Sequence, residues 1–370
     1  MQLETENIEI DSLIVKIASR CNLDCDYCYI YHGQDRSWES MPFRMPDAVV
    51  EGLVDAVSFL CAKQERAPLI AFHGGEPLLF GLAAFDSLVM RIQEQAPRAR
   101  MTVQSNGTIY NSTLEAILKK HRSFLSFSLS VDGFQQENDR HRVDRCGASR
   151  FRKIRETIER ARDAAVLDAI LMVVDLKNSP ERILEFMHWA GAPQYDLLLP
   201  DGDRQSLPPM MDSLDTCEAA KWVLEFSALY CKARRPFGVK MPDDIIERLL
   251  LEKRGLPRSS SSRVRIDLTV DTNGEIKLVD TLRINQRGAD FAGGFKISRA
   301  GIEAALCSTA TKDFLRARDE VAPECEACGH FDMCGGGYMQ HRWDGKSYRN
   351  PSVYCTDYKR IFDVFERALT

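Results

Sequence analysis

Residues 13–28 read LIVKIASRCNLDCDYC, and this stretch decides the fold. Apart from one lysine, residues 13–18 are apolar, which is typical of a buried β-strand. Three cysteines follow, spaced four and then three residues apart. Because ligands in parallel α/β folds gather at the carboxyl ends of the strands, the stretch predicts a strand that delivers a loop of thiols to a binding rim.

The first two hundred residues repeat this pattern of a short strand followed by a helix. Further strands are expected at residues 69–72, 101–104, 125–131, 169–174 and 195–199, with helices at 46–61, 82–95 and 151–164 among them. Six β/α repeats imply a parallel sheet with helices outside it, two repeats short of a closed eight-fold barrel. We therefore expect an α/β fold that begins with an open, partial (β/α)6 TIM barrel.

Short polar motifs follow several of these strands. They are GGEP at 74–77, SNG at 105–107, VDG at 131–133 and LPDGD at 199–203. Since parallel strands end at one edge of their sheet, these motifs and the first cysteines should share one rim. The rim is the predicted functional site.

The C-terminal part follows another pattern. Residues 212–254 are helical in pattern, GLPRSSSS at 255–262 is the best linker, and residues 266–280 predict a β-hairpin with Asn273-Gly274 at its turn. We place the first domain at residues 1–240 and a small α+β domain at residues 241–370.

The composition, with 44% hydrophobic and 28% charged residues and a net charge of -5, is ordinary for a globular protein. No basic stripe with interleaved aromatic residues is present, so we expect no nucleic-acid partner. The first residues are polar and acidic, and no uncharged apolar run approaches the ~20 residues that span a bilayer. We therefore expect a cytoplasmic protein with no membrane partner.

Twelve cysteines in a reducing compartment favour metal or cluster ligation over disulfides. Seven of them fall into two groups, at positions 21–28 and 325–355. The other five are expected in the core (Cys61, Cys217, Cys231 and Cys307) or in a loop (Cys146).

The first group, Cys21, Cys25 and Cys28, suits a cluster with one open iron. Three thiolates can hold three irons of a cubane cluster, and the fourth iron then accepts a small chelating ligand. The alternative is a zinc site of three cysteines completed by His32. Spacing alone leaves both interpretations open.

The motif CNLDCDYCY at 21–29 resembles the CxxxCxΦC signature of the radical S-adenosylmethionine (SAM) superfamily. The resemblance implies a 4Fe-4S cluster on these three cysteines, with SAM chelated at the open iron. HGGEP at 73–77 resembles the GGE motif of that superfamily, which pairs with the SAM amino group. The implied SAM-binding residues are Gly74, Gly75, Glu76, Asn106, Ser130 and Arg142. For Asn106 and Ser130 a turn-forming role is the alternative, and for Arg142 an exposed position at a helix start.

The second group is Cys325, Cys328, Cys334 and Cys355, whose four thiolates can close a 4Fe-4S cluster or hold zinc. This region resembles the SPASM domain of radical SAM peptide maturases. Tyr338 stands where that pattern has another cysteine, and Leu268 and Val279 stand near its expected upstream cysteines. The resemblance therefore implies one auxiliary 4Fe-4S cluster instead of two.

Three further segments resemble the FxsB/GrrM group of peptide maturases: LLLPDGD at 197–203, VDTNGEIKLVDTLRI at 270–284 and CGGGYMQHRW at 334–343. This resemblance implies a carbon–carbon crosslink of the cyclophane type, from an aromatic ring to a side-chain β-carbon, in a ribosomally made precursor peptide. It also implies an external electron donor such as flavodoxin or ferredoxin. Because the first strand begins almost at once, we expect no separate leader-binding domain before it.

Rearomatisation of the crosslinked ring needs a base. Asp280 is the first candidate, because related sulfatase maturases place a carboxylate just after the cysteine of the hairpin. Asp201, on the rim after the sixth strand, is the second, and for both a hydrogen-bonded turn aspartate is the alternative.

Other functions remain open at this stage. In the same class they are an anaerobic sulfatase-type maturase, a peptide epimerase and a thioether synthase. A non-catalytic iron–sulfur or zinc-binding regulator belongs to another class, and it would release no deoxyadenosine when reduced with SAM.

Overall fold

The computed structural model describes residues 8–254, 264–285 and 293–369. The chain forms two compact units. The first consists of Met1–Ser130, His141–Asp168 and Ser261–Leu315, and the second of Val131–Arg140, Ala169–Ser260 and Arg316–Thr370. The expected linker at 255–262 lies outside the described residues, and the division into domains at residue 240 stays a prediction.

The first unit is built on a sheet with the strand order β4-β3-β2-β1-β8-β9. Its strands are β1 (Ile8–Ala18), β2 (Leu69–Gly74), β3 (Arg100–Ser105), β4 (Leu125–Ser130), β8 (Val264–Val270) and β9 (Ile276–Lys277). Neighbouring strands are parallel except β8 and β9, which form the expected antiparallel hairpin.

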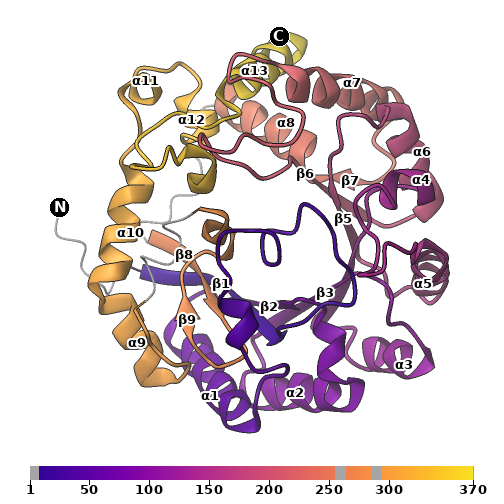
Figure 1. Ribbon diagram of the computed structural model, residues 1–370, viewed down its shortest axis with the longest axis vertical. Helices are drawn as coiled ribbons and strands as arrows, with labels where there is room; N and C mark the ends of the chain where they lie inside the picture. Colours follow the sequence, from indigo (N-terminus) through magenta and orange to yellow (C-terminus); the bar gives the residue numbers. More distant parts are fainter. Residues whose placement is uncertain (1–7, 255–263, 286–292, 370) are drawn as a thin grey trace. The chain divides into compact units, whose positions relative to one another are not determined.

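Helices cover one side of this sheet, and Figure 1 shows α1, α2 and α3 outside β2 and β3. The helices of the first unit are α1 (Asp47–Lys63), α2 (Leu82–Gln95), α3 (Ser112–Lys120), α5 (Phe151–Asp163) and α9 (Arg299–Cys307), with short 3-10 turns at Ser37–Ser40, Pro77–Phe80 and η4 (Asp280–Ile284). Helix α10 (Thr309–Asp319) carries the chain from the first unit into the second.

The strands alternate between two environments. In β2, Ile70 and Phe72 are buried, whereas Ala71 and His73 are partly exposed, and β3 repeats this alternation. Because successive side chains of a strand point to opposite faces, one face is the apolar core beneath the helices. The other face is polar and accessible enough to meet a ligand.

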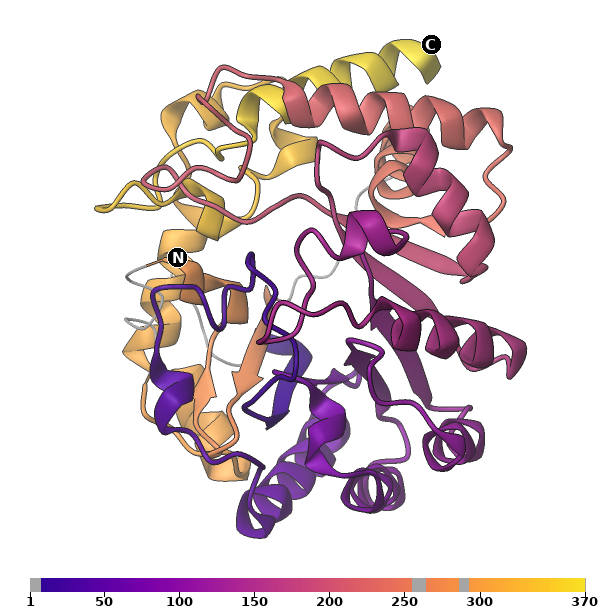
Figure 2. The ribbon, with the colours of Figure 1, turned by 45° about the vertical axis from the view of Figure 1, so that its right-hand side comes forward.

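The second unit carries the parallel strands β5 (Ala169–Val173), β6 (Gln194–Leu198) and β7 (Gly238–Val239). Its helices are α4 (Gln135–Asn138), α6 (Pro180–Ala190), α7 (Glu218–Lys232), α8 (Lys240–Lys253), α11 (Pro323–Glu326), α12 (Phe331–Cys334) and α13 (Cys355–Leu369), with the 3-10 turn η6 (Met339–Arg342). Helix α7 packs against α6 and α13, and Figure 2 shows α13, in yellow, beside α7.

The α/β class with a parallel sheet is confirmed, but several local expectations differ from the structure. The first strand begins at Ile8, five residues before the predicted start at residue 13. Residues 212–254 are not continuously helical, because the short strand β7 separates α7 from α8. Cys231 and Cys307 are exposed instead of buried. Among the described residues no helix is both long and apolar enough to cross a membrane.

We expect Gly74→Ala to destabilise the fold, because Gly74 lies against the end of β1. A Cβ atom there would lie 2.1 Å from the carbonyl oxygen of Ala18, at a φ of +142°. Gly147→Ala is the matched control, since its φ is also positive (+74°) but nothing lies within 4 Å of the added Cβ. Urea denaturation should show a loss of about 3 kcal/mol for the first variant and about 1 kcal/mol for the second. Equal losses would contradict the packing argument.

Candidate active site

The first cysteine loop follows β1 and is held by backbone hydrogen bonds to another segment and within itself. Asp24 N donates to Val143 O at 2.8 Å, and Cys28 N donates to Cys25 O at 3.0 Å within the loop itself. Cys21, Cys25 and Cys28 are all partly buried and free of disulfides. The loop therefore presents three thiols from a fixed backbone.

Groups of both charges surround these thiols. Burial raises the pKa of the Cys21 thiol to about 12, and the carboxylate of Glu76 and the neighbouring Cys25 add to this. Burial also raises the pKa of Cys28, while the cations of Lys16 and Arg142 oppose the shift. Bound iron ions would compensate the negative charge of the three thiolates. The cations of Lys16 and Arg142 would compensate part of the remaining charge of the cluster.

A zinc site completed by His32 fits less well. His32 is turned toward Asp24, with its Nε2 3.1 Å from Asp24 Oδ1, and both side chains are largely exposed. A tetrahedral zinc ion, with Zn–S bonds of about 2.3 Å, draws its sulfurs to within roughly 4 Å of one another. No three cysteine sulfurs in the described part of the chain lie within 4.8 Å of one another.

Gly75 and Glu76 tie the end of β2 to the cysteine loop. Gly75 N donates to Ala18 O at 3.0 Å, and Glu76 N donates to Arg20 O at 2.9 Å. A Cβ atom on Gly75 would lie 2.3 Å from the carbonyl of Arg20 and even closer to the hydroxyl of Tyr31. Glycine is required here because two backbones touch.

The carboxylate of Glu76 is fully buried and joins the ends of two strands. It accepts hydrogen bonds from Leu78 N (3.1 Å), Ser105 Oγ (2.9 Å) and Asn106 N (2.8 Å). Burial raises the pKa of Glu76 to about 7, although these donors and the cation of Arg142 act against the shift. Its role in this structure is to fix the turn after β2.

The three other predicted SAM-binding residues lie in the same unit. Asn106 Nδ2 donates to Cys21 Sγ at 3.5 Å and Ser130 Oγ accepts from Gln104 at 2.9 Å. Arg142 is 6% exposed and donates to the hydroxyl of Tyr27 at 2.8 Å. Arg142 is thus not the exposed helix-start arginine that was the alternative. All three roles in SAM binding stay predictions.

A group of buried charges surrounds Asp280. Lys16 Nζ lies 2.6 Å from Asp280 Oδ1, Arg283 Nε lies 2.8 Å from the same oxygen, and Tyr29 donates to Oδ2 at 2.8 Å. Although burial acts to raise it, the Lys16 and Arg283 cations hold the pKa of Asp280 far below its usual range. Asp280 is therefore an ionised anchor for two cations.

Arg283 extends this group of charges to the hairpin and to the loop after the cysteines. Its Nη2 donates to both oxygens of Asp271, at 2.8 and 2.7 Å, and its Nη1 donates to Asp35 at 2.9 Å. Lys277 also lies 3.1 Å from Asp271. Cations and carboxylates thus alternate through the group, so each buried charge lies beside one of opposite sign.

Asp201, the second predicted base, lies in the second unit. Its Oδ1 is 3.0 Å from His341 Nε2, and Gln340 donates to it at 3.4 Å. The ring of Tyr338, which is 61% exposed, meets His341 edge to face at 5.7 Å. Asp201 is therefore paired with a histidine, a partner that sequence analysis did not foresee.

The second cysteine group comes together where α11, α12 and α13 meet. Burial, together with the charges of Cys355, Cys325 and Cys328, raises the pKa of Cys334 to about 11. The four thiols thus act on one another electrostatically, yet no three of their sulfurs lie within 4.8 Å of one another among the described residues. A cubane spreads its thiolates over four irons, so this spacing suits a cluster better than one zinc ion.

The surroundings of Arg342 favour an iron–sulfur cluster over a zinc ion at the second cysteine group. Arg342 is 1% exposed, and its Nη2 donates to the carbonyl oxygens of Ala317 and Arg318. Its Nε and Nη1 atoms are enclosed without a hydrogen-bond partner in the described chain, and its charge acts on Cys325 and Cys334. A buried cation with two unused donors beside four thiols fits an anionic iron–sulfur cluster.

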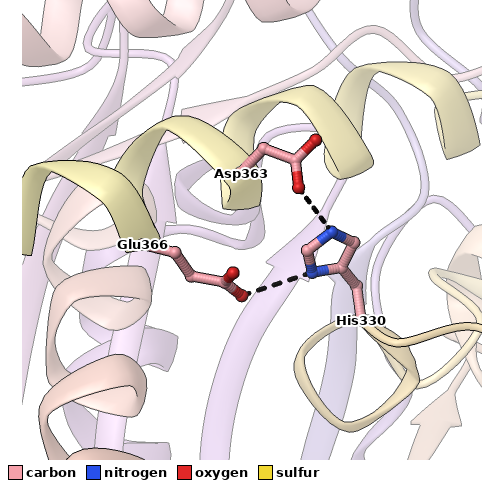
Figure 3. Close-up of side chains that lie close together, drawn as sticks. All are labelled: His330, Asp363 and Glu366. Carbon is pink, nitrogen blue, oxygen red and sulfur yellow. Dashed lines mark hydrogen bonds and ion pairs between the residues drawn. The ribbon is translucent and has the colours of Figure 1, made fainter. Parts of the chain in front are cut away.

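His330, between Cys328 and Cys334, links the cysteine segment to α13 (Figure 3). Its Nε2 lies 2.9 Å from Asp363 and its Nδ1 lies 3.3 Å from Glu366. This is the one group of three candidate ligands within 4.8 Å among the described residues. The two carboxylates face different ring nitrogens, so the three side chains are not arranged around one shared metal ion.

Residues 15–190 match the sequence model of the protein family described as the Radical SAM superfamily. These residues form a radical SAM domain, and the chain is an enzyme. The non-catalytic regulator is thereby set aside, and the superfamily implies SAM and a 4Fe-4S cluster as cofactors of this radical SAM enzyme.

Known proteins can be aligned with nearly the whole length of this chain. A cysteine-type anaerobic sulfatase-maturating enzyme of Clostridium perfringens is 24% identical and is aligned over 97% of each chain. The structure of native anSMEcpe with bound AdoMet and Cp18Cys peptide superposes with a TM-score of 0.81 at 23% identity, covering 97% of each chain. SuiB of Streptococcus suis, bound to its precursor peptide SuiA, gives a TM-score of 0.66 at 15% identity, covering 96% of this chain and 78% of SuiB.

Sequence analysis missed Lys16, Tyr29, Arg283 and Arg342. A lysine inside the apolar run 13–18 was the one available signal, because a buried lysine on a strand needs a partner. Its partner Asp280 lies beyond the reach of any local pattern. His73 was quoted within HGGEP but was given no role.

We expect Lys16→Met to cost about 3 kcal/mol of unfolding free energy at pH 7, because Asp280 loses one of its two buried cations. The native ion pairs lower the pKa of Asp280, so their stabilisation is present above the unfolded value of ~3.9 and is lost as the pH falls. The difference in unfolding free energy between wild type and Lys16→Met should therefore become smaller below about pH 4. Urea unfolding at several pH values measures this.

The matched control is Lys277→Met, which removes the same charge from the more exposed pair with Asp271. It should cost less than half as much, because Asp271 keeps both hydrogen bonds from Arg283. An equal loss for both lysines, or a gap that does not change with pH, would contradict the proposed importance of the pair between Lys16 and Asp280.

Proposed function

We propose that this radical SAM enzyme is a maturase that oxidises the β-carbon of a cysteine or serine side chain in a polypeptide. Its relatives include proteins named cysteine-type and serine-type anaerobic sulfatase-maturating enzymes. The observation that carries the proposal is the polar, partly exposed face of the first unit's sheet. On this face Lys16 of β1, the strand that leads into the cysteine loop, pairs with Asp280. Alignment with the relatives over 97% of both chains supports it.

Cys21, Cys25 and Cys28 would hold the cluster, and the turn fixed by Glu76 would receive SAM. When bound, these cofactors supply a 5′-deoxyadenosyl radical able to remove a hydrogen atom from an unactivated C–H bond, and an auxiliary cluster supplies an acceptor for the electron lost afterwards. Gly75 and Glu76 keep the loop in place during this chemistry, because both donate to its backbone or the strand before it.

Cys325, Cys328, Cys334 and Cys355 are proposed as ligands of one auxiliary 4Fe-4S cluster. Their mutual electrostatic influence, together with the two unused donors of Arg342, supports this assignment. With Tyr338 and Val279 at the positions where the resemblance expects cysteines, no second auxiliary cluster is proposed.

A cyclophane-type crosslink in a ribosomally made precursor peptide is the second candidate. The presence of Val279 and Tyr338 in place of cysteines favours it, since both depart from the two-cluster pattern. Aldehyde formation is placed first because relatives aligned over nearly the whole chain are named sulfatase-maturating enzymes. Flavodoxin or ferredoxin stays the proposed reductant for either reaction.

The central test uses anaerobically reconstituted enzyme with dithionite, SAM and the Cp18Cys peptide carrying deuterium on the cysteine β-carbon. We expect deuterium in the 5′-deoxyadenosine released and an aldehyde at the cysteine, both read by mass spectrometry. A variant with alanine at Cys21, Cys25 and Cys28 should release no nucleoside. Loss of two hydrogens without loss of sulfur would favour the crosslink, and absence of nucleoside from the wild type would refute the enzyme proposal.

We expect Arg342→Gln to lower the reduction potential of the auxiliary cluster. Removing a buried cation disfavours the more negative, reduced state, and a shift on the order of 60 mV corresponds to a tenfold change for a one-electron couple. Arg342→Lys should retain most of the potential, and the exposed Arg360→Gln should change nothing. Redox titration followed by electron paramagnetic resonance measures the shift, and an unchanged potential in Arg342→Gln would place Arg342 away from the cluster.

A further inference from the structure

His73 lies beside the ion pair of Lys16 and Asp280 on the polar face of the sheet. His73 of β2 and Lys16 of β1 are direct partners in the parallel register, so their side chains leave the same face. Lys16 Nζ in turn lies 2.6 Å from Asp280 Oδ1. The residue after His73 is Gly74, where the proposed SAM-binding turn begins.

The ring of His73 has unused hydrogen-bonding capacity. Among the described residues neither ring nitrogen has a hydrogen-bond partner, and Nδ1 is sealed from solvent. The residue as a whole is nevertheless partly exposed. His121 shows the contrast, since it is 3% exposed and its Nε2 lies 2.6 Å from Asp86. A histidine kept for packing is satisfied like His121, whereas His73 lacks a partner for both nitrogens.

The electrostatic setting keeps this imidazole neutral. Burial lowers the pKa of His73, Asp280 of η4 acts to raise it, and Lys16 of β1 acts to lower it further. These are the two charged groups that act on the ring, and they belong to different elements. A neutral imidazole has one unprotonated ring nitrogen, which can accept a proton.

Asp280 itself is a poor proton acceptor in this structure. Its two oxygens are occupied by Lys16, Arg283 and the hydroxyl of Tyr29, and it stays ionised at any ordinary pH. A carboxylate in this state can stabilise a positive charge that forms beside it. It would thus favour the protonated form of a neighbouring imidazole.

We propose that His73 is the catalytic base of the reaction, accepting the substrate proton at its accessible Nε2, and that Lys16 and Asp280 are positioning residues that act through it. This inference rests on the proposed function. It gives His73 the role of base, for which sequence analysis named Asp280 in the crosslinking reaction.

The step balances as follows for a cysteine substrate. One hydrogen atom leaves the β-carbon for the deoxyadenosyl radical. The S–H bond then breaks, with its proton passing to His73 Nε2 and its electron pair staying on sulfur. Loss of one electron to the auxiliary cluster leaves a C=S double bond, which water converts to the aldehyde with release of hydrogen sulfide.

The first experiment compares wild type, His73→Gln and the matched control His121→Gln with the β-deuterated Cp18Cys peptide. Hydrogen abstraction precedes proton transfer, so His73→Gln should still release deuterated 5′-deoxyadenosine. Its yield of aldehyde per deuterated nucleoside should fall on the order of 100-fold. His121→Gln should keep the wild-type ratio, because His121 follows the last residue of α3 and pairs with Asp86 of α2.

The second experiment needs no product. Diethyl pyrocarbonate reacts with neutral imidazole, so site-resolved mass spectrometry of the labelled holoenzyme gives the midpoint pH of His73. Asp280→Asn should move this midpoint to lower pH and Lys16→Met should move it to higher pH, since each removes an opposite charge. Midpoints that do not move in these opposite directions would overturn the coupling of His73 to the pair.

The two proposals fail in different ways. A wild type that releases no deuterated nucleoside refutes the proposed function and, with it, the role of His73. If the wild type forms aldehyde and His73→Gln forms as much aldehyde per deuterated nucleoside as the wild type, the role of His73 is refuted and the proposed function stands. An aldehyde ratio lost in His73→Gln, with the midpoints shifting in opposite directions, supports the proposal.

Discussion

The buried carboxylate of Glu76 is the constraint on which the first site depends. It accepts three hydrogen bonds from residues at the ends of β2 and β3, while its own amide donates to the cysteine loop. One side chain thereby fixes the relative positions of two strand ends and the thiols. The glycines beside it are required because the loop backbone lies where a Cβ atom would be.

The charges around Asp280 follow from the same geometry. Since the sheet has one face under the helices, the opposite face must take the polar residues of β1 and β2. Lys16 on that face is buried and needs an anion, and Asp280 provides it at 2.6 Å. A carboxylate that balances two cations stays ionised and is a poor acceptor for a proton. The neutral imidazole of His73 is the better acceptor.

In the second unit other residues compensate the charge of the second cysteine group. Burial and the neighbouring thiols raise the pKa of Cys325, Cys334 and Cys355, so thiolates are unfavourable in this group unless cations compensate their charge. Arg342 supplies one buried positive charge with two donors still to be used. His330, pinned between Asp363 and Glu366, fastens the segment that carries three of the thiols to α13, which begins with the fourth.

The sequence by itself determined the features that depend on neighbouring residues. Alternating strands and helices predicted the α/β class and Asn273-Gly274 predicted the hairpin, and both are confirmed. These predictions succeed because periodicity and turn chemistry depend on residues that are close in sequence. The two cysteine ligand groups, inferred from spacing in the same way, stay predictions.

Only the tertiary structure decided which charges meet. Tyr29 and Asp280 are 251 residues apart, and the pairing of Lys16 with His73 depends on the register of β1 against β2. No local pattern encodes a register between distant strands, because it results from the packing of the whole sheet. For the same reason the exposure of Cys231 and Cys307 and the partners of Asp280 could be known only from the folded chain.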